Sequence, residues 1–454
     1  AILLQLEAQG DVPADSLLGR SDPDDVLETV RLTVAAVLPD RTSSASGTAA
    51  PGPGRFGLEP RQAVPLTAFV PLPRLARALD LEGRANALLV AGSDGGAPLA
   101  ERLAAAVTVD DLGLSIEPGE GFVTVASREL VLRPAVVSAV ERLAAERGLA
   151  VQPILVYLAN DIRVGEAGIP YSTVAALPTP VPAAFGRLAA PEGEPAVVDG
   201  DGILLNRWAA EELGAVPGDP VTLTYYRVDE RDELATAEHV FTMAGVVEMA
   251  ELGADPSLTP EVPGVSDADD MSGWDPPFPV ELGRIRTSDE EYWDRYRGAP
   301  KAFVALATGQ ELWRSRFGTL TSMRVALPSG QATGEPADAF AAELAEELAA
   351  SLPPEAFGLT FRPVKAEGLE AAAGSTDWSG LFLGFSLFLI VSSALLVGLL
   401  FRLSVEQRAG ELGLLAAVGY PARRIRDRLL GEGAVLAVLG TAAGLALGVL
   451  YARA

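Results

Sequence analysis

Two long apolar runs near the C-terminal end stand out in the pattern of hydrophobic and polar positions along the 454-residue chain. Residues 381–401 form 21 positions without a charged side chain, and residues 433–451 form a further 19. A helix of about 20 apolar residues spans the roughly 30 Å hydrocarbon core of a bilayer. Such runs also occur as buried core helices, whereas a signal peptide is excluded because both runs lie far from the first residue. We therefore predict transmembrane helices over residues 378–401 and 433–452.

The polar segment between the two runs, residues 402–432, predicts the orientation of the chain. It carries six Arg and four acidic residues. Short loops rich in Arg or Lys remain on the cytoplasmic side, and acidic residues count little in this rule. We therefore expect a cytoplasmic loop here and an extracytoplasmic location for residues 1–377. The plain alternative is that the Arg side chains only form a solvated collar facing the lipid.

Apolar residues within this segment recur at helical spacing and predict a short amphipathic helix. Leu412, Leu415 and Gly419 lie on one face of it. Gly419 is suited to end the helix, and Pro421 is suited to the first turn of the next one. A helix this short rarely persists alone in water, so packing against a partner or the bilayer surface has to stabilise it. We favour a protein groove, because so few bulky apolar residues make a weak lipid anchor.

Residues 408–419 read R-x-x-E-L-G-L-L-A-A-V-G, with Arg408 and Glu411 three positions apart on a second helical face. Spaced glycines follow in the second apolar run, after two further residues of the pattern: Ile425 and Glu432. This pattern resembles the FtsX-like/MacB-like family of ABC transporter permeases, closely over residues 375–452 and loosely over the domain before them. The resemblance implies a permease subunit that transmits ATPase-driven motion to a large extracytoplasmic domain. Its work would be export or extraction of a substrate such as a lipoprotein, peptide or drug.

The resemblance also implies partners and sites. The sequence contains no G-x-x-x-x-G-K-[ST] phosphate loop, so ATP hydrolysis is expected in a separate ABC ATP-binding subunit on the cytoplasmic side. The resemblance further implies a second permease copy, contact with membrane lipid and a multi-pass placement in the bacterial inner membrane. In cell-division members it also implies an extracytoplasmic partner. It implies no cofactor. The residues expected to couple to the ATPase are Arg408, Glu411, Leu412, Gly413, Leu415 and Gly419. Glycines four positions apart predict a helix-packing face in the second run: Gly440, Gly444 and Gly448.

The residues before the apolar runs predict an α+β domain with an internal duplication. Six segments recur in the same order in residues 1–117 and 200–370, and the clearest pair is AFVPL at 68–72 and AFVAL at 302–306, each read as a strand. We predict two repeat copies over these ranges, joined by a connecting segment over residues 118–199. The later copy is preceded by a helix and a tight turn that the earlier copy lacks. We therefore expect the chain to be a fragment, with further membrane spans before and after it.

Charge and composition argue against several classes of partner and of catalytic chemistry. The net charge is −26, and the acidic excess lies before the apolar runs because residues 402–432 are net positive. A domain this acidic argues against nucleic acid or anionic lipid as its partner. Because the sequence has no Cys, neither disulfides nor a thiol nucleophile is available.

Few residues are candidates for catalysis or metal binding. The single His, His239, adjoins an apolar strand, so we interpret it as structural rather than catalytic or zinc-binding. Four acidic residues near Gly273 could suit a hard cation, but their spacing is not that of an EF-hand and nearby prolines indicate a solvated loop: Asp267, Asp269, Asp270 and Asp275. Three aromatic residues are interpreted as core, with a partner groove as the alternative: Trp293, Tyr296 and Trp313.

Three hypotheses of function follow. The first is the permease subunit of an ABC transporter. The second is a non-transporting regulator that couples an ATPase to an extracytoplasmic cell-wall hydrolase; members of that kind usually have a small ectodomain, so the large one here favours transport. The third, a membrane-anchored enzyme, has little chemistry to support it.

Overall fold

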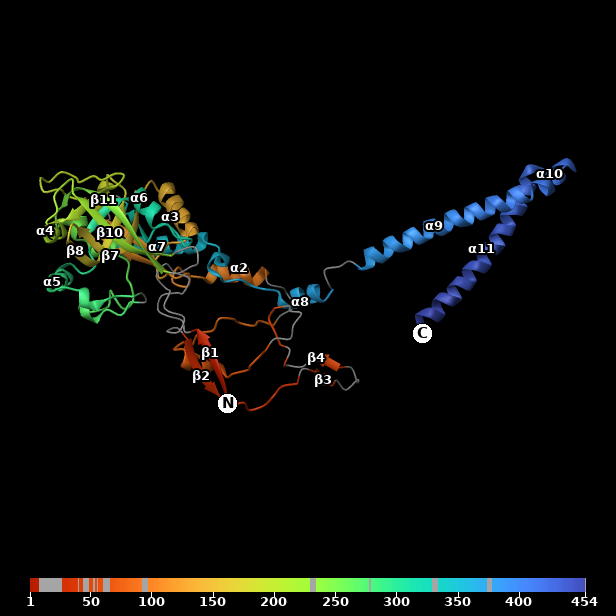
Figure 1. Ribbon diagram of the computed structural model, residues 1–454, viewed down its shortest axis with the longest axis horizontal. Helices are drawn as coiled ribbons and strands as arrows, with labels where there is room; N and C mark the ends of the chain where they lie inside the picture. Colours follow the sequence, from red (N-terminus) through yellow and green to blue (C-terminus); the bar gives the residue numbers. More distant parts are fainter. Residues whose placement is uncertain are drawn as a thin grey trace. The chain divides into compact units, whose positions relative to one another are not determined.

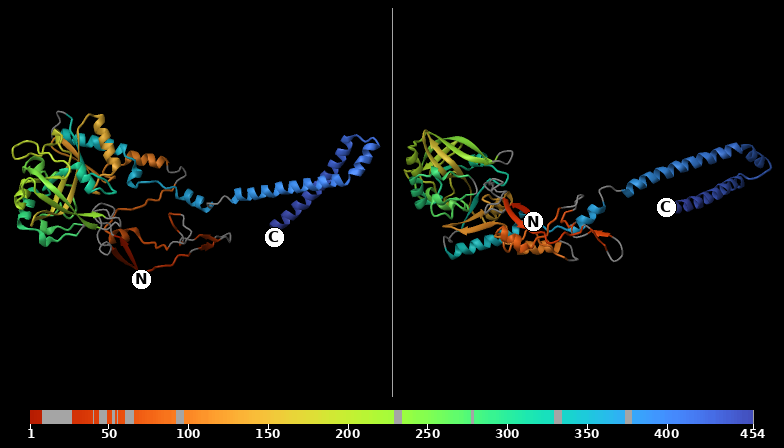
Figure 2. Two further views of the ribbon diagram at one scale, coloured as in Figure 1. Left: turned by 45° about the horizontal axis from the view of Figure 1, so that its top comes forward. Right: turned by 60° about the horizontal axis from the view of Figure 1, so that its bottom comes forward.

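The structure is a computed structural model that divides into two compact units, Ala1–Pro363 and Val364–Ala454 (Figures 1 and 2). The structure describes residues 1–7, 27–39, 41–43, 49–51, 54, 56–59, 66–91, 97–228, 234–276, 279–328, 334–373 and 378–453.

A closed ring of six strands forms the centre of the first unit, as far as its described residues show. The strand order is β10-β11-β9-β12-β8-β7, and β10 also pairs with β7, which closes the ring. The β11–β9 and β12–β8 pairs are parallel, and the other four pairs are antiparallel. The strands are β7 (Val151–Val164), β8 (Ala167–Leu177), β9 (Gly202–Asn206), β10 (Pro220–Val228), β11 (Leu234–Val247) and β12 (Ala302–Ala305).

Aromatic side chains fill part of this ring's core. Tyr157 of β7 stacks on Trp313 at 5.2 Å between ring centroids, and Tyr225 of β10 meets both rings edge-on. Trp313 is only 3% exposed, as expected for a core aromatic. Two short helices adjoin the strands: α4 (Arg207–Leu213) and α6 (Leu306–Leu312).

The first half of β7 belongs to a second, antiparallel group of strands, ordered β7-β13-β6-β5. Strand β6 alternates, with Val123 and Val125 fully buried and Phe122 and Thr124 on the opposite face. The buried face belongs to one hydrophobic core with two helices, because each helix presents an apolar stripe to it. The elements are β5 (Leu114–Pro118), β6 (Phe122–Ser127), β13 (Ser322–Ala326), α3 (Pro134–Glu146) and α7 (Glu335–Ser351).

The other described elements of the first unit are shorter or peripheral. They are β1 (Ile2–Glu7), β2 (Leu27–Leu32), β3 (Arg41–Ser43), β4 (Ala49–Pro51), α1 (Leu72–Ala78), α2 (Ala97–Ala106) and α5 (Thr287–Tyr296), with 3-10 turns that include Glu251–Ala254, Pro256–Leu258 and Met271–Gly273. The unit is a mixed α/β domain, as predicted.

The predicted duplication and domain boundaries stay predictions. The β1–β2 and β10–β11 strand pairs are both antiparallel, with Ile2 opposite Leu32 and Pro220 opposite Thr242. The segment 118–199 supplies β6, β7 and β8 to a sheet whose other strands are β5 and the strands from residues 200–370.

The two AFV segments differ in one respect. AFVAL forms β12 and then begins α6 at Leu306, and AFVPL likewise precedes a helix that begins at Leu72. Residues 68–71 are not in a strand, so the strand expected there is wrong. A strand needs neighbours for its backbone groups; β12 has β8 and β9, whereas residues 68–71 have no paired strand in the described chain.

The second unit is helical: α8 (Val364–Ala373), α9 (Trp378–Gln407), α10 (Ala409–Ala417) and α11 (Ala422–Arg453). The long helices continue beyond the apolar runs, so residues 402–432 are not an extended loop. Ion pairs at helical i,i+4 spacing favour this continuation. Arg402 pairs with Glu406 at 3.0 Å on α9, and Arg428 pairs with Glu432 at 3.7 Å on α11.

Candidate functional site: the junction of the two apolar helices

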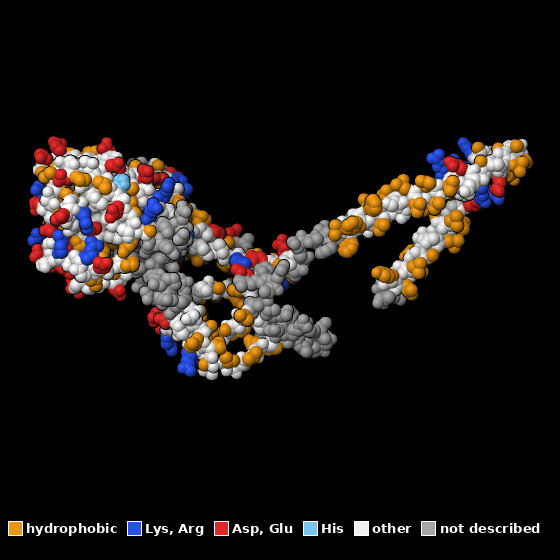
Figure 3. Space-filling view, viewed as in Figure 1, with side chains coloured by type: hydrophobic (Ala, Val, Ile, Leu, Met, Phe, Trp, Pro, Cys, Tyr) orange, Lys and Arg blue, Asp and Glu red, His pale blue; other side chains and the backbone are white. Residues whose placement is uncertain are grey.

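The second unit holds two helices long and apolar enough to cross a membrane, Ser379–Gln407 and Ala422–Tyr451. No residue in the most apolar window of either helix is buried in the structure, so neither is a core helix of a folded domain. Figure 3 shows apolar side chains along both helices and charged ones gathered where the helices meet α10. Physically, such surfaces are stable only in an apolar solvent or against further apolar helices.

Helix α10 ends in a defined cap. Gly419 has φ of +95°, in the left-handed region that glycine tolerates. The Tyr420 N–H donates to the Leu415 carbonyl, and the Gly419 N–H donates to the Ala416 carbonyl, both at 3.0 Å. These two bonds form a Schellman motif, which satisfies carbonyls that the helix end leaves without partners. Gly419 therefore ends the helix as predicted, and α11 begins directly after Pro421.

The Arg408 side chain joins α10 to α11. Its guanidinium donates to the Glu432 carboxylate at 2.7 Å and lies 3.8 Å from the Glu411 carboxylate. Hydrogen bonding to Glu432 raises the pKa of Arg408 above its usual range. Arg408 and Glu411 thus lie together, as their spacing predicted, and Glu432 joins them from 24 residues further along. The sequence motif contained Glu432, but spacing alone did not indicate this pairing.

Exposure divides the apolar residues of α10 into two sets. Leu412 and Leu415, on the predicted docking face, are half-buried, and α10 contacts both α9 and α11. Leu414 and Val418, four positions apart, are 66% and 72% exposed. Sequence reasoning missed this exposed strip, although its i,i+4 spacing is visible in the sequence. The role of the predicted coupling residues, including the exposed Gly413, stays a prediction.

The glycines of α11 also fall into two groups. A side-chain carbon added at Gly433 would lie 3.1 Å from the Phe401 ring, so the two long helices approach closely there. The same addition at the three predicted packing positions, Gly440, Gly444 and Gly448, meets no described atom within 4 Å. Their predicted packing face is therefore open in this structure, and it stays a prediction.

The other candidate residues lie in the first unit. The His239 Nε2 lies 3.3 Å from the Asp201 carboxylate, and its ring lies edge-on to Phe241. Asp270 accepts from the Gly273 N–H at 2.9 Å and from the Ser272 hydroxyl at 2.7 Å, which lowers its pKa. Among the described residues, no group of three or more His or acidic side chains could hold a metal ion. The two bonds accepted by Asp270 are those of a residue that caps a turn.

In the second unit the short helix α10 thus joins two apolar helices that are long enough to cross a membrane. Residues 383–454 match the family model described as FtsX-like permease C-terminal, so this part of the chain is similar to that family. The resemblance predicted from the motif is confirmed here. The family supports a role of the ABC transporter permease type.

No curated protein matches the chain. Among solved structures, the chain is similar to the periplasmic region of MacB from Actinobacillus actinomycetemcomitans, with 12% sequence identity and a TM-score of 0.29, over 54% of this chain and 96% of that one.

Proposed function

We propose that the chain is the transmembrane permease subunit of an FtsX/MacB-type ABC transporter. Residues 1–377 are extracytoplasmic in this proposal, and the junction around α10 is cytoplasmic. The observation that carries it is the α10 motif, which lies between two apolar helices inside the segment that matches the FtsX-like permease model. A separate ABC ATP-binding subunit binds α10 and supplies ATP hydrolysis, and the first unit meets the substrate to be exported or extracted.

The geometry of the junction suits transmission of motion. One residue, Arg408, separates α9 from α10, and the Gly419 cap leads directly into α11. The Arg408–Glu432 ion pair links α10 to α11 a second time. A force on α10 therefore acts on both long helices, whose internally satisfied backbones keep them stiff in lipid. A second permease copy or another span would cover the open glycine face of α11.

Co-expression of the chain with a candidate ABC ATP-binding subunit, followed by co-purification, tests the docking site. Replacing Glu411 by Lys and Leu415 by Asp should reduce the recovered ATPase at least about tenfold, since a charge placed in an apolar interface is costly. The double variant Leu414→Asp with Val418→Asp should reduce ATPase recovery to a similar extent, because Leu414 and Val418 are exposed in the absence of a partner. The matched control is Leu282→Asp, at a residue 40% exposed in the first unit. If both double variants insert normally into the membrane and recover as much ATPase as the control, docking on α10 is refuted.

A further inference from the structure

The six Arg residues between the apolar runs differ in whether they have a counter-charge. Four of them make ion pairs within the same segment: Arg402 with Glu406, Arg408 with Glu432, Arg426 with Asp427 and Arg428 with Glu432. The remaining acidic residue of the segment, Glu411, lies beside Arg408. The other two Arg residues, Arg423 and Arg424, are exposed and have no ion-pair partner among the described residues. The segment therefore offers no free carboxylate to balance these two charges.

The position of the Arg pair in the helix adds to this imbalance. Arg423 and Arg424 lie in the first turn of α11, which begins at Ala422. The N-terminal end of a helix carries a partial positive charge, so cations in its first turn are unfavourable. No acidic residue of that turn offsets them. A partner that brings carboxylates to this turn would relieve a repulsion that remains in the free chain.

The Arg pair follows the exposed apolar strip of α10 in the chain. Val418, which is 72% exposed, precedes Arg423 by five positions, and Tyr420 between them is 49% exposed. The Schellman cap at Gly419 gives this corner a fixed shape, and Figure 3 shows charged side chains gathered with apolar ones around α10. Apolar side chains bordered by charged ones are typical of a protein interface, with an apolar centre and a polar rim.

Distance along α11 argues against a lipid headgroup as the partner of the Arg pair. A helix rises about 1.5 Å per residue, so in the proposed placement Arg424 lies about 14 Å along the axis from Gly433, where the apolar run begins. The headgroup layer on each side of the hydrocarbon core is about 5–8 Å thick. Arg428 lies about 8 Å from Gly433, within reach of that layer, but it is paired with Glu432. The unpaired cations are therefore the ones that lie farther into the cytoplasm.

We propose that Arg423 and Arg424 bind acidic side chains of the ABC ATP-binding subunit, at the edge of the surface where α10 docks. The apolar strip forms the centre of the contact, and the Arg pair selects a partner that carries carboxylates beside its groove. Guanidinium groups suit this role because they bind carboxylates through paired N–H···O bonds. Attraction between such surfaces acts mainly on the rate of association. The inference rests on the proposed function and names the chemistry of the partner's surface.

Association kinetics test this role, with the full chain held in nanodiscs of zwitterionic lipid on an interferometry sensor and the purified candidate ATP-binding subunit in solution. Arg423→Gln with Arg424→Gln should slow association about three- to tenfold at low salt. Added salt should slow association of the unchanged chain, because salt screens exposed charges, and should affect this variant much less.

The matched control is Arg426→Gln with Arg428→Gln, which removes the same charge from the same segment but from Arg residues that already have acidic partners. Both variants leave the same number of Arg residues to orient the loop, so a difference between them does not come from membrane insertion. Equal association rates for the two variants would overturn the inference. A salt dependence that is unchanged in Arg423→Gln with Arg424→Gln would overturn it as well.

Two further outcomes separate this inference from its neighbours. If the Arg423→Gln with Arg424→Gln variant binds more slowly only when the nanodiscs contain anionic lipid, the Arg pair acts on headgroups and the inference is wrong. If the unchanged chain does not bind the ATP-binding subunit at all, the result counts against the proposed function itself. Normal binding by the unchanged chain, with equal rates for the two Arg variants, would leave the proposed function standing and remove only the role of the Arg pair.

Discussion

Replacing Asp289 by Asn should destabilise the first unit strongly, because it leaves a buried Lys without a counter-charge. Asp289 is fully buried at the start of α5 and accepts two bonds from the Arg286 guanidinium, each at 2.9 Å. Its carboxylate lies 3.7 Å from the ammonium of Lys301. That ammonium, 4% exposed by residue, otherwise faces the rings of Trp208 and Tyr292 at 4.7 and 4.9 Å.

The expected loss of folding free energy follows from the interactions that Arg286 and Lys301 still make in Asp289→Asn. Asn can still accept from the Arg286 N–H, so the turn at the start of α5 survives. After the substitution Arg286 still has its ion pair with Glu212 at 3.3 Å, but the Lys301 ammonium contacts only the faces of aromatic rings. Removing one partner of a buried ion pair costs about 3–5 kcal/mol, and we expect the lower end, about 3 kcal/mol, because Arg286 is partly exposed. For a unit of this size that corresponds to a fall in Tm of about 4 °C.

Tryptophan fluorescence during heating of the full chain measures this loss, since four of its five Trp residues lie in the first unit: Trp208, Trp274, Trp293 and Trp313. Glu212→Gln is the control, because it removes a carboxylate that also pairs with Arg286 but is 30% exposed, and it should cost less than about 1 kcal/mol. Adding Lys301→Met to Asp289→Asn should restore stability, since no unpaired charge remains buried. Equal Tm values for Asp289→Asn and Glu212→Gln, or no restoration by Lys301→Met, would refute this reasoning.

Three further outcomes are expected. A Cys at Ser404 should resist a membrane-impermeant thiol reagent in intact cells while one at Ser266 reacts, and the reverse pattern would contradict the proposed orientation. Arg408→Glu should reduce ATPase recovery, and adding Glu432→Arg should restore it; failure to restore would show that the ion pair is not needed. Burial lowers the pKa of Lys301 from 10.5 to about 8, so the unfolded state binds more protons between these values. Stability should therefore rise with pH across that window in calorimetry, and Lys301→Met should remove the rise.

The parts predicted from the sequence are those whose cause is local. A charge-free apolar run specifies a helix by its length, and Gly419 specifies a helix end by its tolerance of a left-handed backbone. The closed ring of strands depends instead on β7, which pairs with three different strands along its length. No local pattern in Val151–Val164 indicates that pairing.

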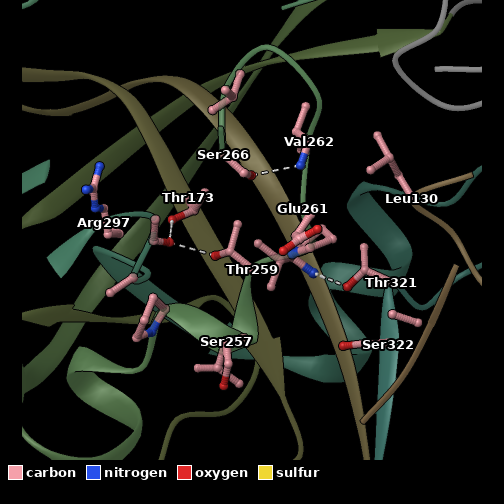
Figure 4. A pocket seen from close by; sticks show the side chains of 18 of the residues that line it. Leu130, Thr173, Ser257, Thr259, Glu261, Val262, Ser266, Arg297, Thr321 and Ser322 are labelled. Atoms are coloured by element: carbon pink, nitrogen blue, oxygen red, sulfur yellow. Dashed lines mark hydrogen bonds between the residues drawn. The ribbon is translucent and has the colours of Figure 1, made fainter. Parts of the chain in front are cut away.

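The candidate sites show the same division between local and distant causes. The proximity of Arg408 and Glu411 follows from their spacing on one helix, whereas the Glu432 contact depends on how α11 returns past α10. The first unit also has a cavity lined by residues from β6, β8 and the 256–269 loop (Figure 4), and no local sequence pattern brings these segments together. Trp293 was interpreted as core with a groove as the alternative, and it is both buried and part of the cavity lining.

The attachments of α10 at the junction suit a short helix that acts as a lever in the proposed function. If α10 were attached at one end only, a bound ATPase could rotate it without moving the membrane helices. In the structure it is attached to α9 through one residue, to α11 through the Gly419 cap, and again to α11 through the Arg408–Glu432 pair. The close approach of Gly433 to Phe401 adds a contact between the long helices beside the same junction. Because these links lie within a few turns of one another, displacement of α10 has to tilt or shift both long helices together.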